Sequence, residues 1–331
     1  MKPFNFFQLI VIVYFIFISI SCNGVSAAEK DGFLWKISGN GLDAPSYLFG
    51  TAHGGPFFAG QAALERVPRL NEIFLSVNQL IAEKKIDNSS SFNKSDLEMD
   101  STYADYLNKE DQIIVDRVLR TYLNATSDKI KLKPLVLMSR IYKKKSIEIY
   151  KEILFEKFKP NTNVDSITLS ELKYISEVEM DVQMIMRAMS LNYSIIGLDD
   201  LIGHINPKRT ISNGISYKQQ IDSLVCAFKD NSVDSIIRHQ LKSSEAVKNA
   251  YFNQDLDDFE LQMIELDLKN NVTAEYNDMI LFDRNKKWME HIPKLILEKA
   301  SLIAVGAAHL PGKDGLINLL RLQGFTVEPV N

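Results

Sequence analysis

The chain has 331 residues, with 38 Lys and Arg against 42 Asp and Glu, a formal charge of −4 and two cysteines. The near balance of charge, without a basic stripe interleaved with aromatic residues, excludes a nucleic-acid-binding protein. Two cysteines cannot build a disulfide framework, and the length allows one large domain with insertions or two smaller domains.

The chain begins with a segment typical of a secretory signal peptide, which we expect to span residues 1–28. Lys2 precedes an unbroken apolar run, and polar residues interrupt that run before the roughly 20 apolar residues that a membrane-spanning helix needs. Two processing outcomes are open. Cleavage could follow the small residues near Ala27 and Ala28, or Cys22 in "SISC" could be lipidated, since this segment resembles a bacterial lipoprotein box. Both predict an exported protein of the bacterial envelope, either periplasmic or tethered to a membrane by the lipid.

Five short apolar runs have the length and the Ile, Val, Leu and aromatic content of β-strands. They are residues 46–50, 78–83, 193–199, 301–306 and 325–330. Stretches with helical spacing lie between them, which predicts an α/β fold with a mostly parallel central sheet flanked by helices. Ahead of them, "FLWKISGNGLDAPSYLFG" predicts a hairpin that leads into the first strand of the core.

Two helical regions interrupt the α/β domain, which we expect to cover residues 29–331. The first is a charged insertion at about 84–172, and the second covers about 205–270. Together they are expected to form a cap. Cys226 lies in an apolar helical context, "IDSLVCAFK", which favours buried packing over catalysis.

Four of the expected strands end in residues that bind metals or transfer protons. Two strands run through a Gly-x-x-His pattern into His53 and His309, and two others end at Glu83 and Asp199. Because the carboxyl ends of parallel strands meet at one edge of a sheet, we expect these side chains to converge. Two imidazoles and two carboxylates suit a divalent first-row metal.

The glycines of the two patterns, Gly50 and Gly306, are expected to allow a sharp turn or a positive φ, so that each histidine points back over its strand end. A single histidine after a strand is more often a packed residue, and a carboxylate there often caps the next helix, as Asp200 beside Asp199 could do. The repetition of the pattern favours the functional interpretation.

The segment after His309 also has structural features. Pro311 and Gly312 predict a turn, and Asp314 is expected to cap the helix that follows. The core positions expected on that helix are Leu316, Leu319 and Leu320.

Arg284 and Asn285 lie on an expected helix among apolar residues. Arg284 could contact an anionic substrate or a transition-state oxyanion, although an exposed ion pair is the commoner use of such an arginine. The remaining histidines, which do not follow strands, are His204, His239 and His291. The chain contains no H-E-x-x-H, no G-x-S-x-G and no P-loop.

Several segments resemble the TraB/GumN family, which also includes the TIKI metalloproteases and is similar in fold to erythromycin esterases and ChaN-type haem-binding lipoproteins. They are "LWKISGNGLDAPSYLFGTAH", "NQLIAE", "EMDVQMIMRAMSLNYSIIGLDD", "FDRNKKWM" and "LIAVGAAHLPGKDGLINLLRLQGFTVEPV". The family's pattern of two Gly-x-x-His turns, an acidic residue and an Arg-Asn pair maps onto His53, His309, Glu83, Arg284 and Asn285. Asp199 departs from the family, which more often has Glu there, and so do Gly54 and Gly55, where an apolar residue is usual.

The resemblance implies a divalent-metal-dependent hydrolase that cleaves a peptide or protein substrate, with Mn, Co or Zn as the candidate metals. It implies that His53, His309 and Asp199 hold the metal, and that Glu83 accepts a proton from the attacking water. Arg284 would stabilise the oxyanion, with Asn285 beside it in the motif. The roles of Glu83 and Asp199 can be exchanged.

Two other interpretations are open. One is a non-enzymatic surface lipoprotein that binds haem or a glycan in the same crevice. The other is a metal-free, esterase-like hydrolase in which one histidine acts as the general base.

Overall fold

The computed structural model describes residues 31–52, 65, 67–85, 97–157, 179–203, 215–230, 232–270 and 272–330. These residues belong to two compact units. The sheet unit contains the described residues of 31–85, 179–203 and 244–330, and the helical unit contains those of 97–157 and 215–243. The predicted leader, with Cys22, lies outside the described residues.

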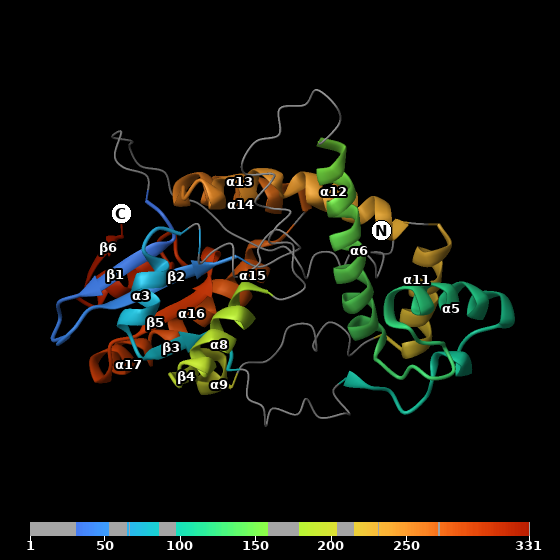
Figure 1. The fold of residues 1–331 in the computed structure, drawn as a ribbon, viewed down its shortest axis with the longest axis horizontal. Coiled ribbons are helices and arrows are strands. Elements are labelled where there is room, and N and C mark those ends of the chain that lie inside the picture. Colours follow the sequence, from blue (N-terminus) through green and yellow to red (C-terminus); the bar gives the residue numbers. More distant parts are fainter. Residues whose placement is uncertain are drawn as a thin grey trace. The chain divides into compact units, whose positions relative to one another are not determined.

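The sheet unit is built on six strands in the order β4-β3-β5-β2-β1-β6 (Figure 1). In chain order they are β1 (Leu34–Ser38), β2 (Ser46–Thr51), β3 (Gln79–Ala82), β4 (Ser194–Gly197), β5 (Leu302–Gly306) and β6 (Thr326–Pro329). Each of the five runs that the sequence marked as strands forms one of them.

The four strands β4, β3, β5 and β2 are parallel to one another, and β1 runs antiparallel to the strands on either side of it, β2 and β6. All residues of β3 and β5 are buried, which matches their unbroken apolar sequences and a sheet covered on both faces. The prediction of an α/β fold with a mostly parallel sheet flanked by helices is therefore confirmed. The carboxyl ends of β2, β3, β4 and β5 lie at one edge.

The expected hairpin is formed by β1 and β2, with Leu34 opposite Phe49 in the register. Its turn contains three consecutive residues with positive φ: Gly39 at 77°, Asn40 at 46° and Gly41 at 85°. Gly and Asn are the residues that adopt this region at the lowest cost, so the turn follows directly from the sequence "GNG".

Helices pack around the sheet. They are α3 (Leu70–Ser76), α8 (Met180–Ser190), α9 (Leu198–Ile202), α13 (Glu245–Phe252), α14 (Leu256–Asn270), α15 (Ala274–Asn277), the π-helix η2 (Asp278–Phe282), α16 (Asp283–Trp288), α17 (Ile292–Glu298), the 3₁₀ turn η3 (Ala307–His309) and α18 (Leu316–Leu322). An aromatic cluster anchors α13 and α14 to the chain before β1: the ring of Phe33 lies 4.4 Å from that of Tyr251 and 5.2 Å from that of Phe259.

The helical unit consists of the 3₁₀ turn η1 (Tyr103–Asp105) and of α5 (Lys109–Leu123), α6 (Pro134–Lys157), α11 (Tyr217–Lys229) and α12 (Ser232–Ser243). Side-chain caps begin two of these helices: Asn108 accepts from the Asp111 amide, and Ser216 accepts from the Gln219 amide. Among the helices of the described residues, none has both the length and the apolar composition to cross a membrane.

Three local predictions are wrong. Cys226 is exposed on α11, because it lies on the polar face of a helix that buries Leu224, Val225 and Ala227 instead. Gly315 precedes α18, and no side chain caps that helix, so Asp314 does not have the expected role. Leu316 and Leu320 are buried on α18 as expected, whereas the third buried residue is Ile317 rather than Leu319.

Candidate functional site

Three of the four predicted strand-end residues lie together at the carboxyl edge of the sheet. Glu83 follows β3 directly, Asp199 lies in the first turn of α9 after β4, and His309 ends η3 after β5. Their side chains are 19%, 7% and 2% exposed. His53, the fourth, lies outside the described residues, so its place in the site stays a prediction.

Glycine is required at the end of β2 for space. A Cβ atom on Gly50 would lie 2.9 Å from the Cα of Ala307 and 3.0 Å from the Cδ2 of Leu310. The positive φ considered for the two glycines is not adopted, since Gly306 has φ −51° and Gly50 is not among the residues with positive φ. The 3₁₀ turn changes the chain direction after β5, with the Leu310 amide donating to the Ala307 carbonyl at 3.1 Å.

The π-helix η2 carries the chain into the site immediately before Arg284. In this turn hydrogen bonds span five residues, as the bond from the Asp283 amide to the Asp278 carbonyl does. Short π-helical turns of this kind recur at functional sites. The guanidinium of Arg284 folds back on the turn, where its Nη1 donates to the Ile280 carbonyl at 3.1 Å.

Arg284 joins the two carboxylates. Its Nη2 lies 2.5 Å from Glu83 Oε2 and 3.0 Å from Asp199 Oδ2, its Nε donates to Asp199 Oδ1 at 3.2 Å, and its Nη1 lies 3.3 Å from His309 Nε2. Burial alone would lower the pKa of Arg284, but the charges of Glu83 and Asp199 outweigh it and hold the pKa above its usual value. Arg284, whose side chain is 14% exposed, is thus a largely buried cation rather than an exposed ion-pair partner, and all three of its nitrogens are engaged.

Trp288 closes this cluster from α16. It is fully buried, and its indole Nε1 donates to Asp199 Oδ1 at 3.2 Å. Its ring lies 4.6 Å from the imidazole of His309 and 4.5 Å from the guanidinium carbon of Arg284. The second distance is that of a cation–π contact, so Trp288 stabilises the buried charge of Arg284 as well as orienting Asp199.

Asn285 fixes the imidazole of His309. It has no exposed surface, its Oδ1 lies 2.7 Å from His309 Nδ1, and its Nδ2 donates to the carbonyls of His309 at 3.2 Å and Asp314 at 2.9 Å. This amide orientation makes Oδ1 the acceptor, so Nδ1 carries a proton. Since Arg284 offers an N–H to Nε2, the network assigns a neutral imidazole whose Nε2 accepts from Arg284 and lies 3.8 Å from Glu83 Oε1.

Glu83 connects three strand ends. Its Oε1 accepts from the Gly306 amide at 2.7 Å, and its carbonyl accepts from the Asp199 amide at 2.8 Å. The same Oε1 lies 3.8 Å from His309 Nε2. Asp200 does not cap α9, which has no side-chain cap; its carboxylate accepts from the Lys85 amide at 3.0 Å and so holds the segment after Glu83.

The donor set suits a divalent cation in its chemistry but is incomplete in the part of the chain that the structure describes. A neutral imidazole with its second nitrogen bound to an amide oxygen is the usual state of a metal-ligating histidine. Two carboxylates and one guanidinium leave a net charge of −1 in the cluster, which favours a cation. Among the described residues, however, no three His, Cys, Asp or Glu side chains are arranged to hold one. A further donor is needed.

The other histidines do not join this cluster, and two residues that support it were not expected to do so from the sequence. His239 lies on α12 in the helical unit, His291 precedes α17, and His204 lies outside the described residues. Trp288 was expected only as one of the apolar residues around Arg284, and no sequence pattern singles out Tyr251. Tyr251, on α13, is fully buried and donates to the Gly50 carbonyl at 2.9 Å, which holds the end of β2. Its hydroxyl is the signal that could have been weighed, because a buried tyrosine needs a hydrogen-bond partner.

Comparison with known protein families shows that the profile of the TraB/PrgY/gumN family matches residues 33–329. No curated protein and no solved structure matched the chain. The family profile spans all six strands and every residue of the cluster that the structure describes.

Proposed function

Because the chain belongs to the TraB/PrgY/gumN family, we propose that the edge of its sheet is the active site of a divalent-metal-dependent hydrolase that cleaves peptide bonds. The observation that carries the proposal is the state of His309. Asn285 Oδ1 binds the Nδ1 of His309, and the Nε2 of His309 lies 3.8 Å from the Glu83 carboxylate. A buried imidazole fixed in this way is ready to bind a metal or to accept a proton.

We assign His309 Nε2 and one oxygen of the Glu83 or Asp199 carboxylate as the groups that would hold the metal. His53 is the further donor that the resemblance implies. When bound, a divalent metal lowers the pKa of a coordinated water towards neutrality. Of the two carboxylates, Asp199 is the more buried and accepts from both Arg284 and Trp288. Glu83 is the more exposed of the two, and its Oε1 lies 3.8 Å from His309 Nε2, so it is better placed to act on water.

In this scheme Glu83 accepts a proton from the attacking water and passes it to the leaving amine. Arg284 holds the Glu83 and Asp199 carboxylates in place and balances part of their charge. Its expected contact with an oxyanion would require one of its bound N–H groups to turn towards the substrate, since all three nitrogens already have acceptors. Asn285 positions His309 and does not itself contact solvent.

We further propose that the protein acts in the bacterial envelope, on peptides or proteins outside the cytoplasm. The support is the sequence of the leader, with its apolar run and either cleavage near Ala27 and Ala28 or lipidation at Cys22. A lipid on Cys22 would tether the enzyme to a membrane face.

One observation favours a second candidate, a metal-free hydrolase. Arg284 Nη1 lies 3.3 Å from His309 Nε2, so the lone pair that a metal would use already accepts a hydrogen bond. His309 would then act as the general base, oriented by Asn285. Haem or glycan binding has no comparable support from these contacts.

Metal analysis of the purified protein tests the proposal. Wild type, His309→Ala and His239→Ala are exposed equally to Mn, Co and Zn and then freed of loose metal. His239, exposed on α12, is the matched control. We expect close to one metal per chain in wild type and His239→Ala, a large loss in His309→Ala, and peptide cleavage that stops after chelation. Cleavage that survives exhaustive chelation would favour the metal-free hydrolase, and no specific metal with no cleavage would refute both.

A further inference from the structure

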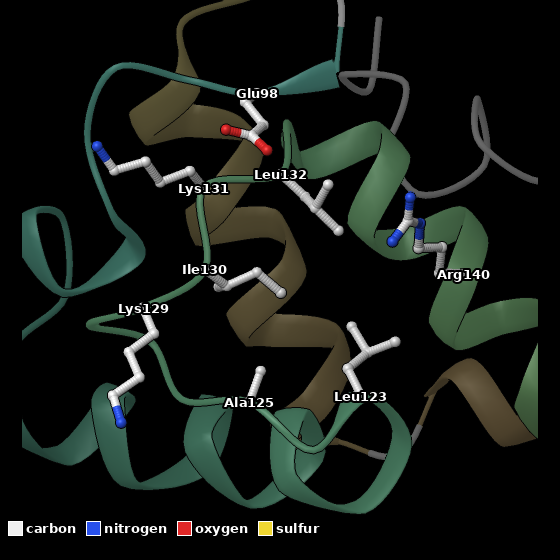
Figure 2. A pocket seen from close by; sticks show the side chains of 8 residues that line it. All are labelled: Glu98, Leu123, Ala125, Lys129, Ile130, Lys131, Leu132 and Arg140. Atoms are coloured by element: carbon white, nitrogen blue, oxygen red, sulfur yellow. The ribbon is translucent and has the colours of Figure 1, made fainter. Parts of the chain in front are cut away.

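The helical unit contains a pocket of its own, independent of the candidate active site. It has a volume of about 420 Å³ and lies where α5 ends and α6 begins (Figure 2). This is within the size range of small-molecule sites. Its lining is apolar at Leu123, Ala125, Ile130 and Leu132 and charged at Glu98, Lys129, Lys131 and Arg140.

Hydrogen bonds to two backbone carbonyls hold the wall of the pocket. The Met99 amide donates to the Lys131 carbonyl at 2.7 Å, and the Tyr103 hydroxyl donates to the Leu132 carbonyl at 2.9 Å. Both bonds fix the connection between α5 and α6 against the preceding segment. A ligand would therefore meet a pre-formed surface, and its binding would not require ordering of this loop.

Positive charge predominates around the pocket: Lys129, Lys131 and Arg140 are cations and Glu98 is an anion, which gives a net charge of +2. Lys131 donates to the Asp100 carbonyl at 3.1 Å. Arg140 is exposed and forms no ion pair with any residue that the structure describes. In Figure 2 the ammonium groups of Lys129 and Lys131 extend away from the apolar side chains, whereas Arg140 lies beside them, on the opposite side of Leu132 from Glu98.

We propose that this pocket binds a small carboxylate that carries an apolar tail. The guanidinium of Arg140 offers two parallel N–H donors that match a carboxylate. Because Arg140 and Glu98 lie on opposite sides of Leu132 (Figure 2), a ligand carboxylate bound to Arg140 would lie away from the carboxylate of Glu98. Leu123, Ile130 and Leu132 provide a small apolar surface for the tail, within a lining that exposes more polar than apolar area. The two lysines, although turned outward, raise the local positive potential that attracts an anion.

Two sources share this chemistry: a free fatty acid and the carboxyl terminus of a peptide with an apolar last residue. Calorimetric titration of the purified protein with octanoate represents the first, and titration with N-acetylleucine represents the second. Octanol and N-acetylleucinamide are the uncharged counterparts. Arg140→Gln removes the proposed carboxylate partner, and Arg117→Gln is the matched control, an exposed arginine on α5 that does not line the pocket.

We expect at least one of the two acids to bind, its uncharged counterpart to bind much more weakly, and Arg140→Gln to weaken binding about tenfold, the loss typical of a charge-assisted hydrogen bond. Arg117→Gln should leave binding unchanged. Preference for octanoate would identify a lipid-derived acid, and preference for N-acetylleucine a peptide terminus. The proposal is overturned if neither acid binds at millimolar concentration, if the uncharged compounds bind as well, or if both arginine variants bind like wild type while unfolding at the same temperature. None of these outcomes depends on the metal site.

Discussion

Removal of the Asn285 side chain should destabilise the protein strongly, because this amide binds two buried groups of one residue, His309. In Asn285→Ala, the Nδ1 and the carbonyl of His309 lose their hydrogen bonds. Each buried group left unpaired costs about 1–3 kcal/mol, which gives about 4 kcal/mol for the two. The third partner of Asn285, the Asp314 carbonyl, is only partly buried and can bind water instead. A loss of this size is a large part of the 5–15 kcal/mol by which domains are typically stable.

Urea unfolding followed by tryptophan fluorescence measures this loss, because both tryptophans, Trp35 and Trp288, lie in the sheet unit. Asn318→Ala is the matched control, since Asn318 donates to the Lys313 carbonyl from an exposed position on α18. The control should change the unfolding free energy by less than about 0.5 kcal/mol. If Asn285→Ala costs no more than Asn318→Ala, the inference that Asn285 fixes His309 is wrong.

Three further predictions concern the sheet unit. Gly50→Ala should cost about 1–3 kcal/mol, because its Cβ would overlap Ala307. Gly32→Ala should cost less, because its nearest contact, at 3.3 Å, is the flexible end of the Gln254 side chain; the urea midpoints of the two variants decide this. Tyr251→Phe should cost about 1–2 kcal/mol by leaving the Gly50 carbonyl without its donor, and an unchanged midpoint would contradict the role assigned to the hydroxyl. Burial, and then the charge of Asp257, raises the pKa of Glu260 above 4.5. The folded state therefore binds this proton more tightly than the unfolded state does. The stability that this difference contributes is lost as pH rises through the folded pKa. Glu260→Gln should therefore gain stability relative to wild type between acidic and neutral pH, and a difference that stays constant with pH would show that Glu260 does not titrate in this way.

Much of the fold was readable from the sequence because its signals are local. The apolar runs of β3 and β5 are short and unbroken, the "GNG" turn requires positive φ, and the strands alternate with helical spacing. The errors also have local causes. Cys226 lies beside buried residues in the sequence but on the other face of α11, which a list of apolar neighbours does not distinguish.

The candidate site was predicted less completely, because its contacts join residues far apart in the chain. Glu83, Asp199 and His309 could be placed at one edge by a rule about parallel strands. No such rule brings Arg284 to them, since Arg284 follows a π-helix whose register is set by packing and not by a sequence pattern. The sequence therefore allowed either an exposed or a buried arginine, and the structure selects the buried one.

The departure at Asp199 becomes understandable from these contacts. An aspartate has a shorter arm than the glutamate that is more usual in the family, which would weaken its reach towards a metal. Here its oxygens are instead met by the Nε and Nη2 of Arg284 and by the Nε1 of Trp288, at 3.0–3.2 Å. Donors on two residues of α16 thus compensate for the short side chain. This geometry favours Asp199 as the anchor of Arg284 and leaves Glu83 and His309 as the pair available for the proposed hydrolysis.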